Sequence, residues 1–264
     1  MKNCLLLFLL FITGTPCCFA QQKTVLLDHY FNHEQQEDKA SGKMVDYHYL
    51  WTETDLNGFS IFGEAFTKNG VKTALLDNGP DADNLKAADI YIIVDPDTKK
   101  ENPDPKFMGP EHIGAIEKWV KAGGVLVLMA NDSTNTELEH FNRLAARFGI
   151  HFLPELSNHV EGDRFEQGAI PVPPGHAVFR TAKKLFMKDI AALKLSKTAK
   201  PLLKKGDEVI MATVRYGKGT VFAVGDPWLY NEYVDGKRLP PEFQNREAAH
   251  DLVKWLVQRT RPKS

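Results

Sequence analysis

Short aliphatic runs alternate with longer amphipathic segments along most of the chain, and this alternation restricts the fold more than any other feature. Each aliphatic run has the length of a single strand, and each amphipathic segment repeats its apolar residues at helical spacings of three and four. Strands that alternate with helices build a mostly parallel sheet covered by helices on both faces. The sequence therefore predicts a doubly wound, mostly parallel α/β sheet.

The predicted strands are rich in aliphatic and β-branched residues. The clearest is the run at 89–94, which is typical of a strand covered on both faces and which stops at Asp95-Pro96-Asp97. A glycine-containing turn at 216–219 favours a hairpin near the C-terminus. The other strands are expected at residues 24–27, 71–76, 125–129, 150–153, 190–195, 208–214 and 220–224.

Amphipathic segments predict helices between these strands. Asp55 is placed to cap a helix that carries Phe59, Phe62 and Phe66 on one face and ends at Asn69-Gly70. Further helices are expected from Pro110 up to Gly123, over residues 136–148, and as a closing helix over 242–258. The strands after residue 154 are read as an elaborated C-terminal part of the same domain.

The first twenty residues have the three parts of a secretory signal. Lys2 gives a positive start, residues 5–12 form an apolar stretch too short to span a membrane, and Ala20 offers a small residue at a cleavage point. We therefore expect a signal peptide over residues 1–20, one domain over residues 21–264, a periplasmic or secreted location, and no membrane span after cleavage.

Cysteine usage and charge exclude several classes of function. All three cysteines, Cys4, Cys17 and Cys18, lie in the predicted signal, so the remaining chain has no disulfide and no thiol nucleophile. The whole chain has a formal charge of −1, and loss of Lys2 makes it −1 − 1 = −2. This balance lacks the basic surface that nucleic acids or anionic membranes require, so no nucleic acid partner is expected.

Polar and aromatic residues follow several of the predicted strands. In an open parallel sheet, ligands bind beyond the carboxyl ends of the strands. Aromatic rings can stack on sugar faces while carboxylates and amides bond to hydroxyl groups, so the mixture suits a carbohydrate. The alternative is that Asp and Asn at these positions cap helices and turns. The candidate ligand residues are Asp28, His29, His48, Trp51, Asp95, Asn131, Asp132, Asp226, Trp228, Tyr230 and Asn231, with Tyr47, Tyr49 and Tyr233 as aromatic neighbours.

Metal and cofactor motifs are missing from the sequence. Asp28, His29 and His33, together with Asp95 or Asp226, have the side chains that zinc or manganese prefers. No tight ligand spacing such as HExxH supports that grouping, so no metal is predicted. Glycine-rich phosphate loops are also absent after the strands, so no nucleotide cofactor is expected.

No complete catalytic motif accompanies the candidate residues. Ser133 follows a strand but lacks the flanking glycines of a GxSxG nucleophile turn. Asp132, Glu161 and Asp226 allow a two-carboxylate glycosidase arrangement, whose required separation the sequence does not fix. Catalytic roles therefore stay unassigned, and whether the chain is an enzyme stays open.

Three segments carry a family resemblance: residues 89–97 (DIYIIVDPD), residues 119–132 (WVKAGGVLVLMAND) and, above all, residues 225–237 (GDPWLYNEYVDGK). They resemble an uncharacterised class I glutamine amidotransferase-like domain that is associated with, or fused to, bacterial unsaturated rhamnogalacturonyl hydrolases. The resemblance covers nearly all of the chain after the signal. It implies a flavodoxin-like sheet, a periplasmic setting and a link to pectin breakdown. It implies no amidotransferase activity, because the cysteine nucleophile is missing.

These observations lead to one leading hypothesis and two alternatives. The first is an exported accessory or carbohydrate-binding domain in the use of pectin (rhamnogalacturonan) oligosaccharides, with an oligosaccharide or a glycan-degrading hydrolase as its partner. The second is a hydrolase that acts on oligosaccharides containing uronic acid, using carboxylates at the strand ends. The third is a docking module for a partner hydrolase.

Overall fold

The computed structural model describes residues 22–261. The expected signal peptide, with the three cysteines, lies outside the described residues and stays a prediction. Among the described helices, none is long and apolar enough to cross a membrane.

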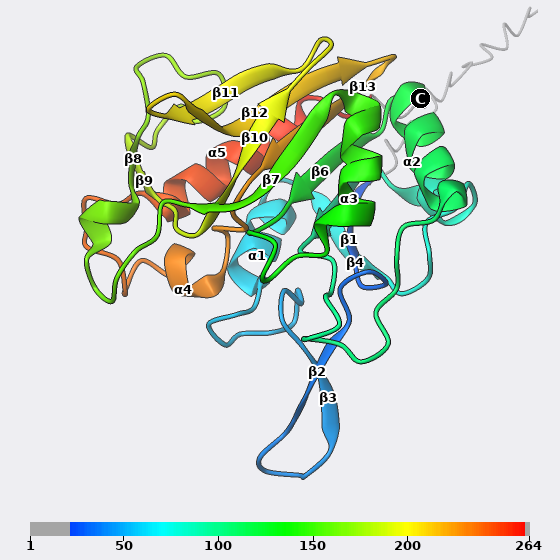
Figure 1. The fold of residues 1–264 in the computed structure, drawn as a ribbon, viewed down its shortest axis with the longest axis horizontal. Coiled ribbons are helices and arrows are strands. Elements are labelled where there is room, and N and C mark those ends of the chain that lie inside the picture. The colour runs from blue at the N-terminus through cyan, green and yellow to red at the C-terminus, as the bar shows by residue number, and fades with distance from the viewer. Residues whose placement is uncertain (1–21, 262–264) are drawn as a thin grey trace, which may run out of the picture.

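A nine-stranded sheet runs through the described part of the chain (Figure 1). Its strand order is β4-β1-β5-β6-β13-β12-β10-β7, and β11 pairs with β12 beside this path. The first five strands in this order pair in parallel, whereas the remaining pairs are antiparallel. The parallel strands are β1 (Lys23–Asp28), β4 (Val71–Leu76), β5 (Ile90–Val94), β6 (Val125–Met129) and β13 (Gly219–Val224). The antiparallel ones are β7 (Ile150–Ser157), β10 (Ile190–Leu195), β11 (Lys200–Lys205) and β12 (Glu208–Tyr216).

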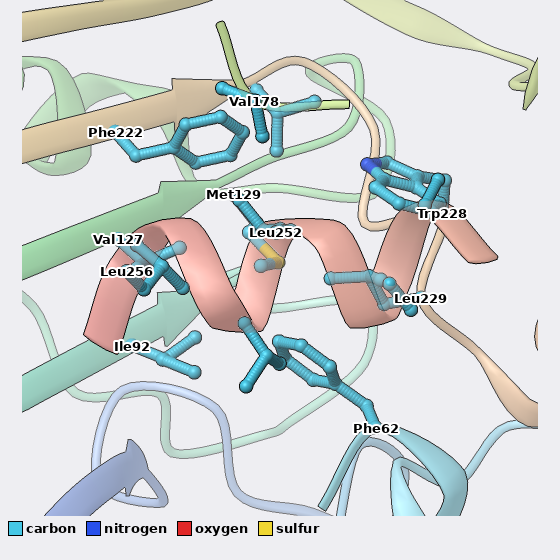
Figure 2. Close-up of a cluster of buried hydrophobic side chains, with 14 of the residues drawn as sticks. Phe62, Ile92, Val127, Met129, Val178, Phe222, Trp228, Leu229, Leu252 and Leu256 are labelled. Carbon is cyan, nitrogen blue, oxygen red and sulfur yellow. The ribbon is translucent and has the colours of Figure 1, made fainter. Parts of the chain in front are cut away.

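Helices cover both faces of the sheet, as predicted. On one face, α1 (Ser60–Lys68) and α5 (Asn245–Val257) pack on inward residues such as Ile92 of β5. Figure 2 shows Leu252 and Leu256 of α5 beside that strand. On the other face, α2 (Pro110–Ala122) and α3 (Leu138–Ala145) pack on the alternate strand residues, such as Tyr91. Because successive strand residues point to opposite faces, each buried strand contributes to both cores.

Most predicted elements are confirmed, with two corrections at helix starts. The strands at 71–76, 125–129 and 190–195 have the predicted bounds. Asp55 does not cap α1: the residue before that helix is Phe59, and no side chain caps it. The single helix predicted at 136–148 is divided into α3 and a 3-10 turn that follows it. The helix starts after Glu137, whose side chain caps α3 by accepting a hydrogen bond from the His140 N–H.

Several short elements were not predicted. A hairpin of β2 (Glu34–Glu37) and β3 (Met44–Tyr47) forms its own two-stranded sheet and extends away from the main sheet in Figure 1. The additional elements are the strands β8 (Ala169–Pro171), β9 (Lys184–Phe186) and β11, the helix α4 (Asn231–Val234), and the 3-10 turns η1 (Asn84–Ala87), η2 (Ala146–Phe148) and η3 (Phe165–Gly168).

Candidate functional site

A polar pocket of about 260 Å³ opens beyond the carboxyl ends of β5, β6 and β13. Asp95, Asn131 and Asp226 follow these three strands and all line the pocket. Loops, the strand β2 and the helix α4 add further acidic groups, three tyrosines and one lysine. The acidic lining residues are Glu34, Asp95, Glu101, Asp189, Asp226 and Glu232, and the others used below are His48, Tyr49, Lys188, Tyr230 and Tyr233.

Asp95 is held by hydrogen bonds from three partners. One carboxylate oxygen accepts from the Tyr49 hydroxyl at 2.5 Å. The other accepts from the Asn131 backbone N–H at 2.7 Å and from the Thr136 hydroxyl at 2.6 Å. Burial nevertheless raises the pKa of Asp95 to about 6, because desolvation outweighs these bonds. Asp95 therefore changes charge close to neutral pH.

Asp226 is a second buried carboxyl group in the same pocket and is 2% exposed. It accepts one hydrogen bond, from the Lys188 backbone N–H at 2.9 Å. Burial raises its pKa well above the usual range, and the nearby charge of Asp95 adds to that rise. The chain reaches this position through Gly225, where a Cβ would lie 1.9 Å from the Ala191 carbonyl oxygen. Only glycine fits there, so the sequence Gly225-Asp226 sets the carboxyl group at the strand end.

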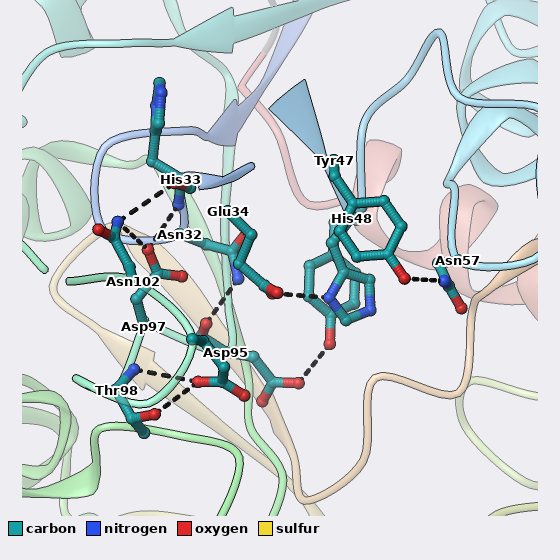
Figure 3. A network of polar contacts seen from close by, with 12 residues as sticks. Asn32, His33, Glu34, Tyr47, His48, Asn57, Asp95, Asp97, Thr98 and Asn102 are labelled. Atoms are coloured by element: carbon teal, nitrogen blue, oxygen red, sulfur yellow. Dashed lines mark hydrogen bonds and ion pairs between the residues drawn. The ribbon is translucent and has the colours of Figure 1, made fainter. Parts of the chain in front are cut away.

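Phenol groups complete the buried part of the pocket. The hydroxyls of Tyr49 and Tyr230 lie 2.7 Å apart, and burial raises the pKa of both phenols well above 10. Both groups therefore stay neutral and can donate hydrogen bonds. His48 stacks on the Tyr49 ring with centroids 3.9 Å apart, and its Nδ1 lies 2.7 Å from Glu34 (Figure 3).

Left-handed backbone conformations gather around this pocket. His48, Tyr49, Asp95 and Asp189 have φ angles of 73°, 60°, 34° and 52°, and all four line it. Residues other than glycine adopt this region at a cost of about 1–3 kcal/mol each, and such strain concentrates at functional sites. The clustering favours this pocket as the candidate site, independently of its polar lining.

The pocket brings together part of the predicted ligand set. His48, Asp95, Asn131, Asp226 and Tyr230 line it, as do the aromatic neighbours Tyr49 and Tyr233. The remaining candidates lie elsewhere and have other contacts, namely Asp28, His29, Trp51, Asp132, Trp228 and Asn231.

Asp28 and Asp132 fix local backbone. Asp28 accepts hydrogen bonds from the Tyr91 hydroxyl and from the N–H groups of Phe31 and Asn32. Burial raises its pKa to about 7. Asp132 accepts from the Thr134 N–H at 2.8 Å, in the turn that follows β6. The contacts of both residues agree with the alternative that the sequence left open, in which Asp side chains after a strand cap turns.

Trp51, Trp228 and Asn231 also have structural contacts. The Trp51 indole donates to the Ala74 carbonyl, and Trp228 is completely buried in the hydrophobic core. Because the Trp228 ring is enclosed, it offers no face for a sugar. The Asn231 amide donates to two backbone carbonyls in the loop before α1, those of Glu53 and Asp55.

Two predicted groupings are not brought together. Asp132 and Glu161 do not line the pocket with Asp226, and Glu161 is an exposed partner of Arg164. The paired buried carboxyls are Asp95 and Asp226 instead. Likewise His29 and His33 line a separate pocket that includes none of Asp28, Asp95 and Asp226.

Glu101, Lys188 and Asp189 line the pocket without having been predicted. They lie in loops where no strand end or motif marks them, and only folding brings these loops to the sheet edge. The left-handed backbone of Asp189 becomes visible only in the structure.

The sequence matches no protein-family model and no curated protein. Solved structures share its fold. The mmIFT52 N-terminal domain has a TM-score of 0.63 at 15% identity, with 89% of this chain and 97% of that chain covered. The cytoplasmic protein STM1381 from Salmonella typhimurium LT2 has a TM-score of 0.58 at 13% identity, covering 90% and 100%. An exo-β-1,4-mannosidase from Opitutaceae bacterium strain TAV5 has a TM-score of 0.51 at 14% identity. The match covers 91% of this chain and 36% of that enzyme. At these identities the likeness establishes the α/β fold with its mostly parallel central sheet.

Proposed function

We propose that this chain is an accessory or carbohydrate-binding domain whose polar pocket holds a neutral sugar residue. The observation that carries the proposal is the pairing of two buried carboxyl groups, Asp95 and Asp226, with two buried phenols in one pocket beyond the strand ends. Carboxyl, phenol and amide groups bond to the many hydroxyls of a sugar ring. A volume of about 260 Å³ lies just below the roughly 300 Å³ at which drug-sized sites begin, which favours a small ligand.

The charge of the lining favours a neutral sugar over a uronate. Acidic side chains dominate the pocket, and Lys188 is the one Lys or Arg among its described lining residues. A uronate carboxylate placed there would face like charges, which costs binding energy. Among pectin-derived sugars, we therefore propose a neutral residue as the ligand.

The family link is part of the same proposal. We place the chain with the flavodoxin-like, class I glutamine amidotransferase-like domains of pectin utilisation, without amidotransferase activity, since residues 19–264 contain no cysteine. The ligand pocket at the carboxyl ends of parallel strands agrees with this placement. A similar fold within the exo-β-1,4-mannosidase is compatible with a role beside glycan-degrading activities, including binding to a partner hydrolase.

A second candidate function is glycoside hydrolysis. It is favoured by one observation: Asp95 and Asp226 share a pocket while their pKa values are both raised, to different degrees. Two carboxyls whose environments separate their pKa values supply an acid and a base, which is the arrangement that glycoside hydrolysis uses.

Calorimetric titration with neutral sugars and with uronate-containing oligosaccharides tests the binding function. The informative variant is Asp226→Asn, because asparagine keeps the shape of the neutral carboxyl group. We expect it to weaken binding of the neutral sugar by about tenfold or more. Asp81→Asn is the matched control, since Asp81 caps the turn that leads into η1, outside the pocket. Equal binding by wild type and Asp226→Asn contradicts the proposal.

Product analysis separates the two candidate functions. Sugar release that is lost in both Asp95→Asn and Asp226→Asn supports the hydrolase. Sugar binding without release supports the binding domain. Capture of a co-expressed hydrolase in a pull-down, with no sugar binding, supports the docking module instead.

A further inference from the structure

Two histidines and an aspartate meet outside the sugar pocket. His29 and His33 lie in the loop after β1, with ring centroids 4.4 Å apart, and Asp46 belongs to β3 of the protruding hairpin. One ligand atom from each of the three residues lies within 4.8 Å of the others. We propose that His29, His33 and Asp46 bind a divalent transition metal ion of the zinc class.

The second nitrogen of each imidazole ring is already oriented by an acceptor. His29 Nδ1 lies 2.7 Å from the Asp77 carboxylate, and His33 Nδ1 lies 3.1 Å from the backbone carbonyl oxygen of His29. Since a carboxylate and a carbonyl only accept, Nδ1 carries the proton in both rings and donates it. In the neutral rings, each Nε2 then presents a lone pair. Metal-binding histidines have this arrangement, in which the outer acceptor fixes tautomer and ring orientation.

The buried nitrogen of His29 is the independent sign of a ligand. His29 is 5% exposed, and its Nε2 has no hydrogen-bond partner among the described residues. Buried polar atoms nearly always have a partner, so an orphaned lone pair needs an explanation. A metal ion between His29 and Asp46 satisfies this atom and neutralises the Asp46 carboxylate.

One ligand pair already has nearly the spacing of a bound site, and all three ligand atoms lie within 4.8 Å of one another. Zinc bonds of about 2.0–2.1 Å at tetrahedral angles separate two ligand atoms by about 3.3 Å. His33 Nε2 and Asp46 Oδ1 are 3.5 Å apart, so this pair needs almost no movement. His33 and Asp46 are partly exposed, and Asp46 Oδ1 accepts one hydrogen bond from the Gln35 side-chain amide at 2.9 Å, which metal binding would replace. The adjoining pocket of about 410 Å³ leaves room for a water or a ligand at the remaining coordination position.

Bound metal would attach the hairpin to the body of the domain. Asp46 belongs to β3 of the hairpin that extends away from the main sheet in Figure 1, whereas the buried His29 directly follows β1. The turn of this hairpin exposes Lys39 and Lys43, which are trypsin sites. Metal that holds the hairpin in place should therefore slow cleavage at these lysines.

The second cluster of potential ligands provides the control. Glu137, Glu139 and His140 also group their ligand atoms at the start of α3. There His140 Nδ1 and the His140 N–H are both bonded to Glu137, which caps the helix. This cluster is explained by capping, and a His140→Gln variant reports any binding at it.

The test is a zinc titration of the full chain in which Cys4, Cys17 and Cys18 are replaced by serine, so that no thiolate takes up metal. After chelator treatment, calorimetry with ZnCl₂ is run on this protein and on His33→Gln, Asp46→Asn and His140→Gln. We expect one zinc per chain, affinity reduced by about tenfold or more in the first two variants, and unchanged affinity in His140→Gln. Circular dichroism without zinc confirms that each variant is folded.

Two results overturn the proposal: no zinc binding below about 100 µM, or binding that His33→Gln and Asp46→Asn leave unchanged. Tryptic cleavage at Lys39 and Lys43 gives a second readout. Zinc should slow it at least about threefold in wild type and His140→Gln, and leave it unchanged in Asp46→Asn. Equal protection in Asp46→Asn also counts against the site.

Discussion

The Tyr49 hydroxyl donates a 2.5 Å hydrogen bond to the Asp95 carboxylate, and both residues have left-handed backbone conformations. Tyr49 lies in the loop after the β2–β3 hairpin, whereas Asp95 directly follows the central strand β5. The bond therefore joins a loop to the sheet at the pocket floor, where two strained residues support each other. Strain of this kind persists only where the surrounding contacts over-determine it.

Replacing Tyr49 with phenylalanine tests that support. The change removes the donor to Asp95 and the contact with the Tyr230 hydroxyl, leaving buried acceptors with fewer partners. We expect the free energy of unfolding to fall by about 1–3 kcal/mol, measured by urea denaturation. Tyr47→Phe is the control, because the partly exposed Tyr47 hydroxyl accepts a hydrogen bond from the nearby Asn57 side-chain amide and bonds to no carboxylate among the described residues. Equal losses of unfolding free energy in the two variants would show that the Tyr49–Asp95 hydrogen bond stabilises the fold no more than an ordinary, partly exposed hydrogen bond.

Stability should depend on pH through Asp28. Burial raises its pKa from 3.8 to about 7 in the folded protein. A carboxyl with a raised folded pKa binds its proton more tightly when folded, so its contribution to stability is complete below pH 3.8. That contribution declines as the pH rises to about 7 and is then lost. We therefore expect the Asp28 titration to lower the free energy of unfolding by a few kcal/mol between pH 4 and pH 7.

The comparison of wild type with Asp28→Asn isolates this effect. Asparagine does not titrate, so the stability difference between the two proteins should shrink as the pH rises from 4 to 7. Urea denaturation at several pH values measures it. Asp163→Asn, at an exposed loop position, should give a curve parallel to wild type. A parallel curve for Asp28→Asn as well would mean that Asp28 does not titrate in this range.

The parallel strands were predictable because short, mostly aliphatic runs favour a buried strand over other structures. The runs that became β4 and β6 are short and mostly apolar, and each directly follows a glycine, so their bounds were predicted correctly. The β2–β3 hairpin was not predictable, since Glu34–Glu37 is entirely polar and has no apolar alternation. Its conformation depends on cross-strand pairing with Met44–Tyr47, which periodicity does not report.

The residues of the candidate site also fall into a predictable and an unpredictable group. Asp95 and Asp226 were predictable because they follow buried strands of a parallel sheet, and that position alone places them at the ligand edge. Trp228 follows the same strand as Asp226, yet the chain turns it into the core. Lys188 joins the pocket through long-range contacts, such as the hydrogen bond from its N–H to Asp226. Sequence position identifies the edge, and loop folding decides which side chains face it.

Asn231 should be a major determinant of loop structure. Its amide donates to the carbonyls of Glu53 and Asp55 and to the Ser60 hydroxyl, and its oxygen accepts from the Ile61 N–H at the start of α1. Asn231→Ala removes the partner of all four part-buried groups at once, and we expect a loss of roughly 2 kcal/mol or more in unfolding free energy.

Asn69→Ala is the matched control for this loss. The Asn69 amide makes one hydrogen bond, to the Ala65 carbonyl, at a partly exposed helix end. Urea denaturation should show a loss of about 1 kcal/mol or less for it. A loss in Asn231→Ala no larger than this would contradict the assigned role.

Trp228 should affect folding and leave sugar binding intact. The ring is fully buried and contacts Phe179 edge to face in the core, and it does not line the polar pocket. Trp228→Ala should cost about 3–5 kcal/mol of stability through the cavity it leaves.

Trp228→Phe keeps most of the apolar volume and removes an indole N–H that has no partner among the described residues. We therefore expect Trp228→Phe to stay folded and to bind neutral sugar within about twofold of wild type by calorimetry. A folded Trp228→Phe protein that fails to bind would place this ring in contact with the ligand, as in a stacking site, and would require the loop after β13 to open.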